Sequence, residues 1–380
     1  MNEFVYITKA AAFFPNNPVP NKDMEQYLGV INEKSSLAKR VILGKNGIKR
    51  RYYALDKAGN TTHTNVQITV NAVKGLLDEE VTLEDIDVIA CGTSSQEQLI
   101  PSHGVMVHGE LGSKRNTEVV SFAGTCCSGM HALKYIYMSI LTGNAQNAVC
   151  TGSERMSAWM TARNFRKEAE NLALLEEKPM LAFEKEFLRW MLSDGAAALL
   201  LQDKPAGNGI SLRIDWIELA SFANEIETCM YAGSEKREDG TLDGFSSFSE
   251  EEWLTKSIFS LKQDTRLLAG YIVPFGGQLL KRLAAKRNFT SGDIDWFLPH
   301  ISSMFFKEQI KLEFEKIDFA IPDRKWFLNL PNVGNIGSAS AFVMLEELMR
   351  SGKLKKGEKI LIMVPESARF SYCYCMLTVC

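Results

Sequence analysis

The chain has little of what several classes of protein require. Its net charge is −3, because 43 Lys and Arg stand against 46 Asp and Glu, and the two signs are mixed along the chain. A protein that binds nucleic acid or a membrane surface carries a concentrated basic face, which this balance does not predict. No apolar run reaches the roughly 18 residues of a membrane span. The first residues, "MNEFVYITKAAAFFPNNPVP", are typical of a strand and a turn rather than a signal peptide. We therefore expect a cytoplasmic protein with no membrane span and no nucleic-acid partner.

Metal ligands and disulfide patterns are also scarce. The chain contains only five histidines, which form no cluster, and it contains no C-x-x-C pair. Eight cysteines in a chain with no signal peptide are typical of free thiols rather than disulfides. The sequence therefore predicts no metal site.

Two pairs of segments resemble each other at nearly the same separation. "EDIDVIACGTSS", ending at Ser95, matches "GDIDWFLPHISS", ending at Ser303. "SFAGTCCSGMHALKYIYMSILTGNAQNAVCTGSE" matches "LPNVGNIGSASAFVMLEELMRSGKLKKGEKILIMVPES" as strand, small-residue turn, helix and strand. Generic likeness between β-α-β units is the alternative, but two pairs in the same order favour a duplication. We therefore predict an α/β protein of two halves, with two mixed sheets covered by helices and the central helices of both halves packed together.

The predicted boundary between the halves lies at the turn "DKPAGNG" (203–209). It gives an N-terminal half at 1–205 and a C-terminal half at 206–380. Residues 155–192 are rich in Met, Trp and Phe and fit neither repeat. We predict that they form a cap insertion over an apolar tunnel, although a plain amphipathic helix pair fits them equally well.

The stretch "FAGTCCSGMHA" places two adjacent cysteines at the predicted start of a helix. The positive end of a helix dipole favours a thiolate, and a strand-to-helix turn exposes a nucleophile. The duplication brings equivalent loops of both halves together around a pseudo-twofold axis. Those loops carry Cys127, His300 and Asn335, which are therefore the candidate catalytic residues.

Several segments resemble known motifs in the same order. "TCCSGMHALKYI" resembles the A-C-A-G-F active-site stretch of ketoacyl-acyl-carrier-protein synthase III, a family of the thiolase superfamily. "DWFLPH" is similar to its D-W-x-x-P-H motif, and "NVGNIGSAS" is similar to its G-N-T-S-A-A motif. "LSDGAAALLL" and "NGIKRRYYA" resemble two further motifs, so that the likeness covers nearly the whole chain. The resemblance implies a thiolase-like five-layered αβαβα fold of two duplicated halves and a homodimer. It also implies no cofactor, because the substrates arrive as thioesters of acyl carrier protein or coenzyme A.

The resemblance also implies catalytic roles. The family's C-x-G pattern aligns with Cys127, Ser128 and Gly129, which makes Cys127 the nucleophile and leaves Cys126 as a packing residue. Cys127 would accept an acyl group from one thioester. His300 and Asn335 would then stabilise the enolate of a second thioester, which attacks the acyl group. The oxyanion would be held by the N–H of Cys127 and by an N–H from the C-terminal loop.

The sequence departs from the family pattern at three places that contact substrates. "PESARFSYC" replaces a glycine-rich loop, and "ISS" follows His300 instead of Gln-Ala-Asn. The predicted substrate-binding residues are Ile100, which the family places in the partner's acyl pocket, and Ser367, Ala368, Arg369 and Phe370. Val41 aligns with a tryptophan that stacks on coenzyme A in the family, which favours a carrier-protein-linked donor. The predicted docking site for an acidic carrier protein consists of Arg40, Lys45, Lys49, Arg50 and Arg51, although a solvated basic face is an equal alternative.

These departures resemble ketosynthase III-like enzymes of secondary metabolism. The likeness is greatest to ketosynthases that join two chains into dialkylresorcinol precursors, such as those of flexirubin-type lipids. The leading prediction is therefore an acyltransferase that performs a Claisen condensation with a malonyl or β-ketoacyl thioester, followed by ring closure. Two alternatives are an acyltransferase to an alcohol or amine and a non-catalytic partner subunit. A papain-like peptidase also uses Cys, His and Asn, but the duplicated architecture argues against this class.

Overall fold

The computed structural model describes residues 2–31, 37–165 and 187–380. Its centre is a nine-stranded mixed sheet. In spatial order the strands are β13 (Trp296–Pro299), β14 (Lys359–Glu366), β15 (Ser371–Val379), β8 (Leu212–Ser221), β1 (Tyr6–Phe13), β7 (Gly195–Gln202), β6 (Asn147–Glu154), β4 (Val88–Thr93) and β5 (Glu118–Ala123).

The strand order repeats on the two sides of the β1–β8 pair. Outward from β1 the order is β7, β6, β4 and β5, and outward from β8 it is β15, β14 and β13. The pairing repeats as well, with two antiparallel ladders followed by a parallel one on each side. A parallel bridge from Phe297 to Trp326 occupies the place that β5 has in the first half. Only two residue pairs join β1 to β8, Tyr6–Arg213 and Ile7–Leu212. The two predicted sheets are therefore connected by a short antiparallel ladder into one.

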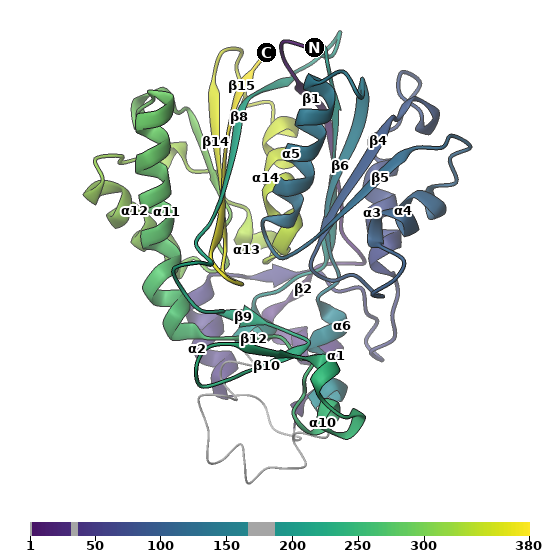
Figure 1. Ribbon diagram of the computed structural model, residues 1–380, viewed down its shortest axis with the longest axis vertical. Helices are drawn as coiled ribbons and strands as arrows, with labels where there is room; N and C mark the ends of the chain where they lie inside the picture. Colours follow the sequence, from purple (N-terminus) through teal and green to yellow (C-terminus); the bar gives the residue numbers. More distant parts are fainter. Residues whose placement is uncertain (1, 32–36, 166–186) are drawn as a thin grey trace.

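Two helices lie side by side between the halves of the sheet, α5 (Ser128–Leu141) and α14 (Ser340–Arg350) (Figure 1). Small residues allow their starts to approach closely. A Cβ added to Gly129 or to Gly152 would lie 2.5 Å from the carbonyl oxygen of Ser338. Because a side chain at either glycine would collide with this backbone, the packing of the central helices depends on them.

Longer helices cover the outer faces of the sheet. α3 (Asn65–Lys74) and α4 (His103–Leu111) cover the N-terminal half, and α11 (Thr265–Arg287) and α12 (Phe305–Lys316) cover the other half (Figure 1). The layers are thus helix, sheet, helix, sheet and helix. No described helix has the length and apolar character needed to cross a bilayer.

Short elements gather at the end of the layers opposite the two chain termini (Figure 1). They are α1 (Met24–Leu28), α2 (Leu37–Asn46), α6 (Ser157–Met160), α10 (Glu250–Thr255), β2 (Val19–Pro20), β3 (Arg50–Arg51), β9 (Met230–Tyr231), β10 (Ser234–Lys236), β11 (Leu242–Gly244) and β12 (Lys262–Gln263), with α13 (Leu330–Val333) nearby. Of the predicted cap insertion at 155–192, residues 166–186 lie outside the described part of the chain. The predicted boundary at 205 lies between β7 and β8.

Candidate active site

A cavity of about 310 Å³ lies between the central layers and the short elements, and residues from both halves of the chain line it. Most of its wall is apolar. The polar side chains that reach it include Cys126, Glu154, Gln263, His300, Asn335 and Ser367. A mainly apolar wall with a few convergent polar groups is the usual composition of a small-molecule site.

The two adjacent cysteines occupy different environments. Cys126 lines the cavity together with His300 and Asn335. Cys127 has no exposed surface, packs in the core between the two halves, and directs its thiol at the carbonyl oxygen of Val364 at 3.3 Å. Cys126 lies in the turn before α5, and Cys127 is the N-cap residue of this helix. The structure therefore corrects the predicted placement of Cys127, because the cysteine that lines the cavity with His300 and Asn335 is Cys126.

Both thiols are surrounded by groups that favour the protonated form. Burial raises the pKa of Cys126, and the negative charges of Glu366 and Glu154 raise it further. Burial likewise raises the pKa of Cys127 well above its usual value. The resting site therefore holds Cys126 as a neutral thiol at neutral pH.

His300 follows β13 and is almost completely buried. Its backbone N–H donates to the carbonyl oxygen of Met363 at 2.7 Å, which ties this loop to β14. Burial lowers the pKa of His300 to about 4. The imidazole is therefore neutral at pH 7, with one nitrogen as a donor and the other as an acceptor.

Asn335 is held by three hydrogen bonds. Its backbone N–H donates to the carbonyl oxygen of Met191 at 3.0 Å, and its own carbonyl accepts from the N–H of Ser193 at 2.8 Å. The side-chain Oδ1 accepts from the N–H of Gly337 at 2.9 Å. Because Oδ1 is engaged, the NH₂ group is the part of this amide that can donate to a molecule in the cavity.

Two buried or half-buried carboxylates at the site were missed by the sequence analysis. Glu154 ends β6 and accepts hydrogen bonds from the hydroxyls of Ser94 at 2.6 Å and Ser95 at 2.8 Å. It also accepts from the backbone N–H of Ser338 at 3.1 Å, so that it joins the two halves. Burial raises the pKa of Glu154. A single acidic residue at the end of a predicted strand does not indicate in the sequence that it will join the two halves at the site.

The second missed carboxylate belongs to Glu366 at the end of β14. Its Oε2 accepts from the N–H of Cys127 at 2.9 Å and from the N–H of Thr125 at 3.3 Å. The predicted use of the Cys127 N–H as an oxyanion donor is therefore wrong, because a carboxylate already occupies that group. Among the described residues, no other residue accepts a hydrogen bond from the N–H of Cys126. In the sequence, the only sign of this carboxylate was the acidic residue within "PESARF".

Of the four predicted pocket residues that follow Glu366, only Ser367 lines the cavity. Its hydroxyl accepts from Nε2 of Gln263 at 3.2 Å. Ala368, Arg369 and Phe370 do not line the cavity, which corrects the prediction for these three residues. The carbonyl oxygen of Ala368 accepts from the N–H groups of Cys229 and Met230, Arg369 is exposed, and the ring of Phe370 is buried against Tyr271 and Phe275. Ile100 is 87% exposed, and its role in a partner's pocket stays a prediction.

The five residues of the predicted basic docking site differ in their exposure to solvent. Arg51 is completely buried and donates from Nη1 to Asn21 at 2.7 Å and from Nη2 to the carbonyl oxygen of Trp190 at 3.2 Å. It cannot contact a carrier protein, which corrects the prediction for this residue. Its neighbours in the predicted site, Arg40, Lys45, Lys49 and Arg50, are exposed.

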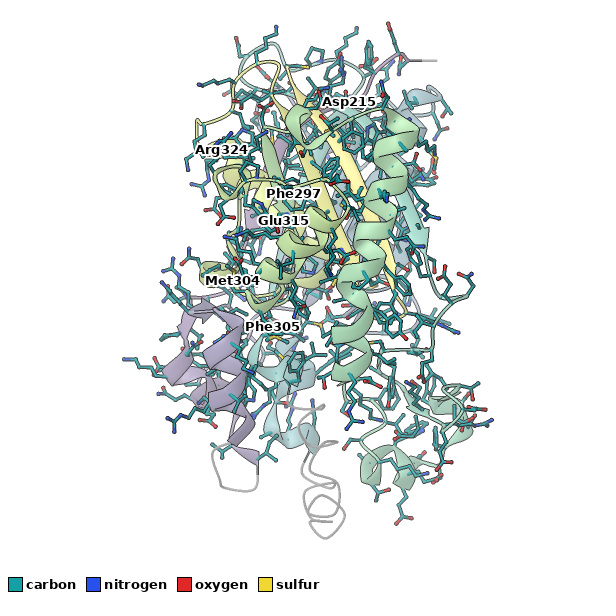
Figure 2. All side chains as sticks on the ribbon, turned by 90° about the vertical axis from the view of Figure 1, so that its left-hand side faces the viewer. Asp215, Phe297, Met304, Phe305, Glu315 and Arg324 are labelled. Carbon is teal, nitrogen blue, oxygen red and sulfur yellow. The ribbon has the colours of Figure 1, made fainter. Side chains whose placement is uncertain are left out.

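The exposed basic residues lie near the loop that follows His300. The N–H of Met304 donates to the carbonyl oxygen of Asn46, the last residue of α2, at 2.9 Å. Figure 2 shows Met304 and Phe305 beside α2 at this end of the molecule. A carrier protein bound to α2 would therefore lie next to the loop that carries His300.

Comparisons with known proteins agree with this architecture. A family described as "Thiolase, N-terminal domain" matches residues 56–181. A family described as "3-Oxoacyl-[acyl-carrier-protein (ACP)] synthase III C terminal" matches residues 284–365. The chain is 24% identical to a β-ketoacyl-[acyl-carrier-protein] synthase III of Clostridium perfringens over 92% of both chains.

Solved structures are similar over the whole chain. OleA of Xanthomonas campestris, with bound lauric acid and lauroyl-CoA, has a TM-score of 0.77 at 17% identity and full coverage of both chains. The 3-oxoacyl-[acyl-carrier-protein] synthase III of Aquifex aeolicus has a TM-score of 0.68 at 18% identity, covering 98% of this chain and 99% of the other. The predicted thiolase-like fold is therefore confirmed.

Proposed function

We propose that this protein, a β-ketoacyl synthase III-like condensing enzyme with a thiolase fold, forms its acyl-enzyme on Cys126. The acyl group is then joined to a second thioester by a Claisen condensation. The observation that carries this proposal is that Cys126, His300 and Asn335, from three separate segments, line one cavity with a mainly apolar wall.

The first half-reaction transfers an acyl group to the enzyme. The sulfur of Cys126 attacks the carbonyl carbon of an acyl thioester, and the bond from that carbon to the donor's sulfur breaks. The proton of the Cys126 thiol passes to the donor's sulfur, and the donor leaves as a thiol. The N–H of Cys126 is the proposed donor to the oxyanion of the intermediate. Loss of one such donor typically lowers the rate by about 10²–10³.

The second half-reaction makes the carbon–carbon bond. The second thioester enters with its carbonyl oxygen between the imidazole of His300 and the NH₂ group of Asn335. Both donors are neutral, and they stabilise the enolate as it forms by decarboxylation or deprotonation. The enolate carbon attacks the acyl carbonyl, and Cys126 leaves as a thiolate that is then protonated. In the decarboxylating route the carboxylate of the second thioester leaves as CO₂, so that the enolate forms without a base.

The proposed substrates are a thioester with a long alkyl chain and a second thioester with a β-oxo group. Leu268, Ile272, Phe306 and Ile310 line the cavity. A wider recess of about 1130 Å³ shares Ser94, Trp159 and Ala232 with it, which supports a second path for a chain. The Gln263–Ser367 pair places an amide and a hydroxyl in the wall, where they suit the oxo group of a β-ketoacyl thioester. These features support a dialkylresorcinol-type product.

The proposed donor is linked to an acyl carrier protein that binds Arg40, Lys45, Lys49 and Arg50. These cations are exposed, and the Asn46–Met304 hydrogen bond joins the end of α2 to the loop that follows His300, which supports this proposal. The proposed working form is a cytoplasmic homodimer, in which the exposed Ile100 inserts into the partner's acyl pocket.

Intact-protein mass spectrometry tests the nucleophile and the donor together. Wild type, Cys126→Ala and Cys127→Ala are incubated with acyl and β-ketoacyl thioesters of acyl carrier protein and of coenzyme A. We expect an acyl mass increment on wild type and Cys127→Ala but not on Cys126→Ala. An increment that persists in Cys126→Ala and disappears in a folded Cys127→Ala would return the role to Cys127. Acylation of wild type without any condensed product would favour transfer to an alcohol or amine instead.

A further inference from the structure

Glu366 reaches from the C-terminal half of the chain to the start of α5 in the N-terminal half. Its Oε2 accepts from the N–H of Thr125 at 3.3 Å and from the N–H of Cys127 at 2.9 Å. These two residues flank Cys126, so that the carboxylate lies beside the Cys126 backbone. The contact is tertiary, because 239 residues separate Glu366 from Cys127.

The position of this carboxylate determines what the helix can do for the sulfur. The N–H groups at the first turn of a helix carry its positive end, and a thiolate placed there is stabilised. In this protein a carboxylate accepts from the N–H of Cys127, the N-cap residue of α5, and from the N–H of Thr125 in the turn before it. The helix start is therefore already paired with an anion, and an adjacent thiolate would be repelled by that anion.

Several further titratable groups surround the pair. They are Glu154 at the end of β6, His131 on α5, His300 after β13, and Cys127 and Cys373 in the core beside them. His131 is exposed in part to solvent on α5, and partial desolvation lowers its pKa even though the charge of Glu366 raises it. The pKa of His300 is lowered to about 4, so that both imidazoles favour the neutral form. Among the described groups that act on Cys126, the charged ones are anionic.

We propose that Glu366 is a positioning residue that withholds the positive end of α5 from Cys126 and keeps this sulfur as a thiol until an acyl thioester binds. This inference rests on the proposed role of Cys126 as the nucleophile. Such a thiol is unreactive toward small electrophiles and oxidants in solution, because the thiolate is the reactive species. Reaction is then reserved for a carbonyl that is held in the cavity.

The rate of alkylation of Cys126 by iodoacetamide, followed by peptide mass mapping from pH 6 to pH 10, tests this role. Glu366→Gln keeps an oxygen that can accept from the Cys127 N–H but removes the charge. We expect the midpoint of its alkylation profile to move to lower pH and its rate at pH 7.5 to rise roughly three- to tenfold. Glu366→Asp retains the charge and should stay close to the wild-type profile. Glu308→Gln on the exposed face of α12 is the matched control and should not change it.

An unchanged midpoint in Glu366→Gln would reduce Glu366 to a structural helix cap, and a midpoint at higher pH would mean that it activates the sulfur. Either outcome overturns the proposal. If Glu366→Gln does not fold, a midpoint in Glu366→Asp above that of wild type overturns it as well. The alkylation experiment uses no acyl substrate. A failure of this inference would appear in the alkylation profile, whereas a failure of the proposed function would appear as missing acylation of Cys126 in the mass spectra.

Discussion

The backbone N–H of Cys127 donates to the carboxylate of Glu366 at 2.9 Å, and this bond connects the start of the central helix α5 to the end of β14. It lies where the two halves of the duplicated fold meet. The same contact uses the N–H group that Cys127 would otherwise offer to an oxyanion. One long-range contact therefore places a negative charge beside Cys126, the proposed nucleophile.

Replacement of His300 should separate the two half-reactions. His300→Ala removes a donor to the proposed enolate but leaves Cys126 in place, so that acyl-enzyme should still form while condensed product falls by about 10²-fold or more. Acyl-enzyme is measured by intact mass and product by chromatography with mass detection. His63→Ala, remote from the cavity, should leave both unchanged. Loss of acylation in His300→Ala would instead place this residue in the first step.

Stability should fall when the pH is lowered, because two buried histidines resist protonation. Burial lowers the pKa of both His300 and His103 to about 4, against about 6.5 in an unfolded chain. The unfolded chain therefore binds more protons between these values, and the free energy of unfolding decreases as the pH falls from 6.5 toward 4.

Each histidine should cost about 2 kcal/mol between pH 7 and pH 5. Urea unfolding at the two pH values measures the loss. His103→Gln removes one of the two contributions and should lose less stability over this range than wild type. An equal loss in both proteins would assign the pH dependence to other groups.

The close approach of Gly152 to Ser338 across the two halves predicts a large penalty for a small substitution. Gly152→Ala would place a Cβ 2.5 Å from the carbonyl oxygen of Ser338, and the resulting shift should lower the free energy of unfolding by about 1–3 kcal/mol or more. Gly270→Ala in α11 meets no atom within 4 Å and should be neutral or stabilising, because alanine favours a helix. Thermal unfolding compares the two variants. Equal melting temperatures would contradict the predicted contact.

The two adjacent arginines should respond differently to substitution. Arg51→Ala removes buried hydrogen bonds to Asn21 and Trp190 and should destabilise the fold by about 1–3 kcal/mol. Arg50→Ala should leave stability unchanged but lower kcat/KM for carrier-linked donors severalfold, with little effect on coenzyme A-linked donors. Steady-state kinetics at two salt concentrations measures this difference. An equal effect on both donors would argue against a carrier-protein site at α2.

The sequence by itself determined the class of fold and the chemistry of the candidate site. The paired segments around Ser95 and Ser303 predicted the duplicated halves, and the matching strand–helix segments predicted that the two central helices pack together. Local pattern was sufficient for these predictions, because hydrophobic periodicity and turn residues report on each element separately. His300 and Asn335 were predicted because each follows or opens such an element.

Tertiary structure alone decided which groups meet. Whether Cys126 or Cys127 faces the cavity depends on the conformation of the turn that leads into α5, and Cys127 is buried between the two halves at that point. The burial of Arg51 beside Trp190 and the contact of Glu366 with Cys127 join residues more than a hundred positions apart. Charge and spacing along the chain carry no information about such contacts, since they arise only when the two halves of the fold pack together.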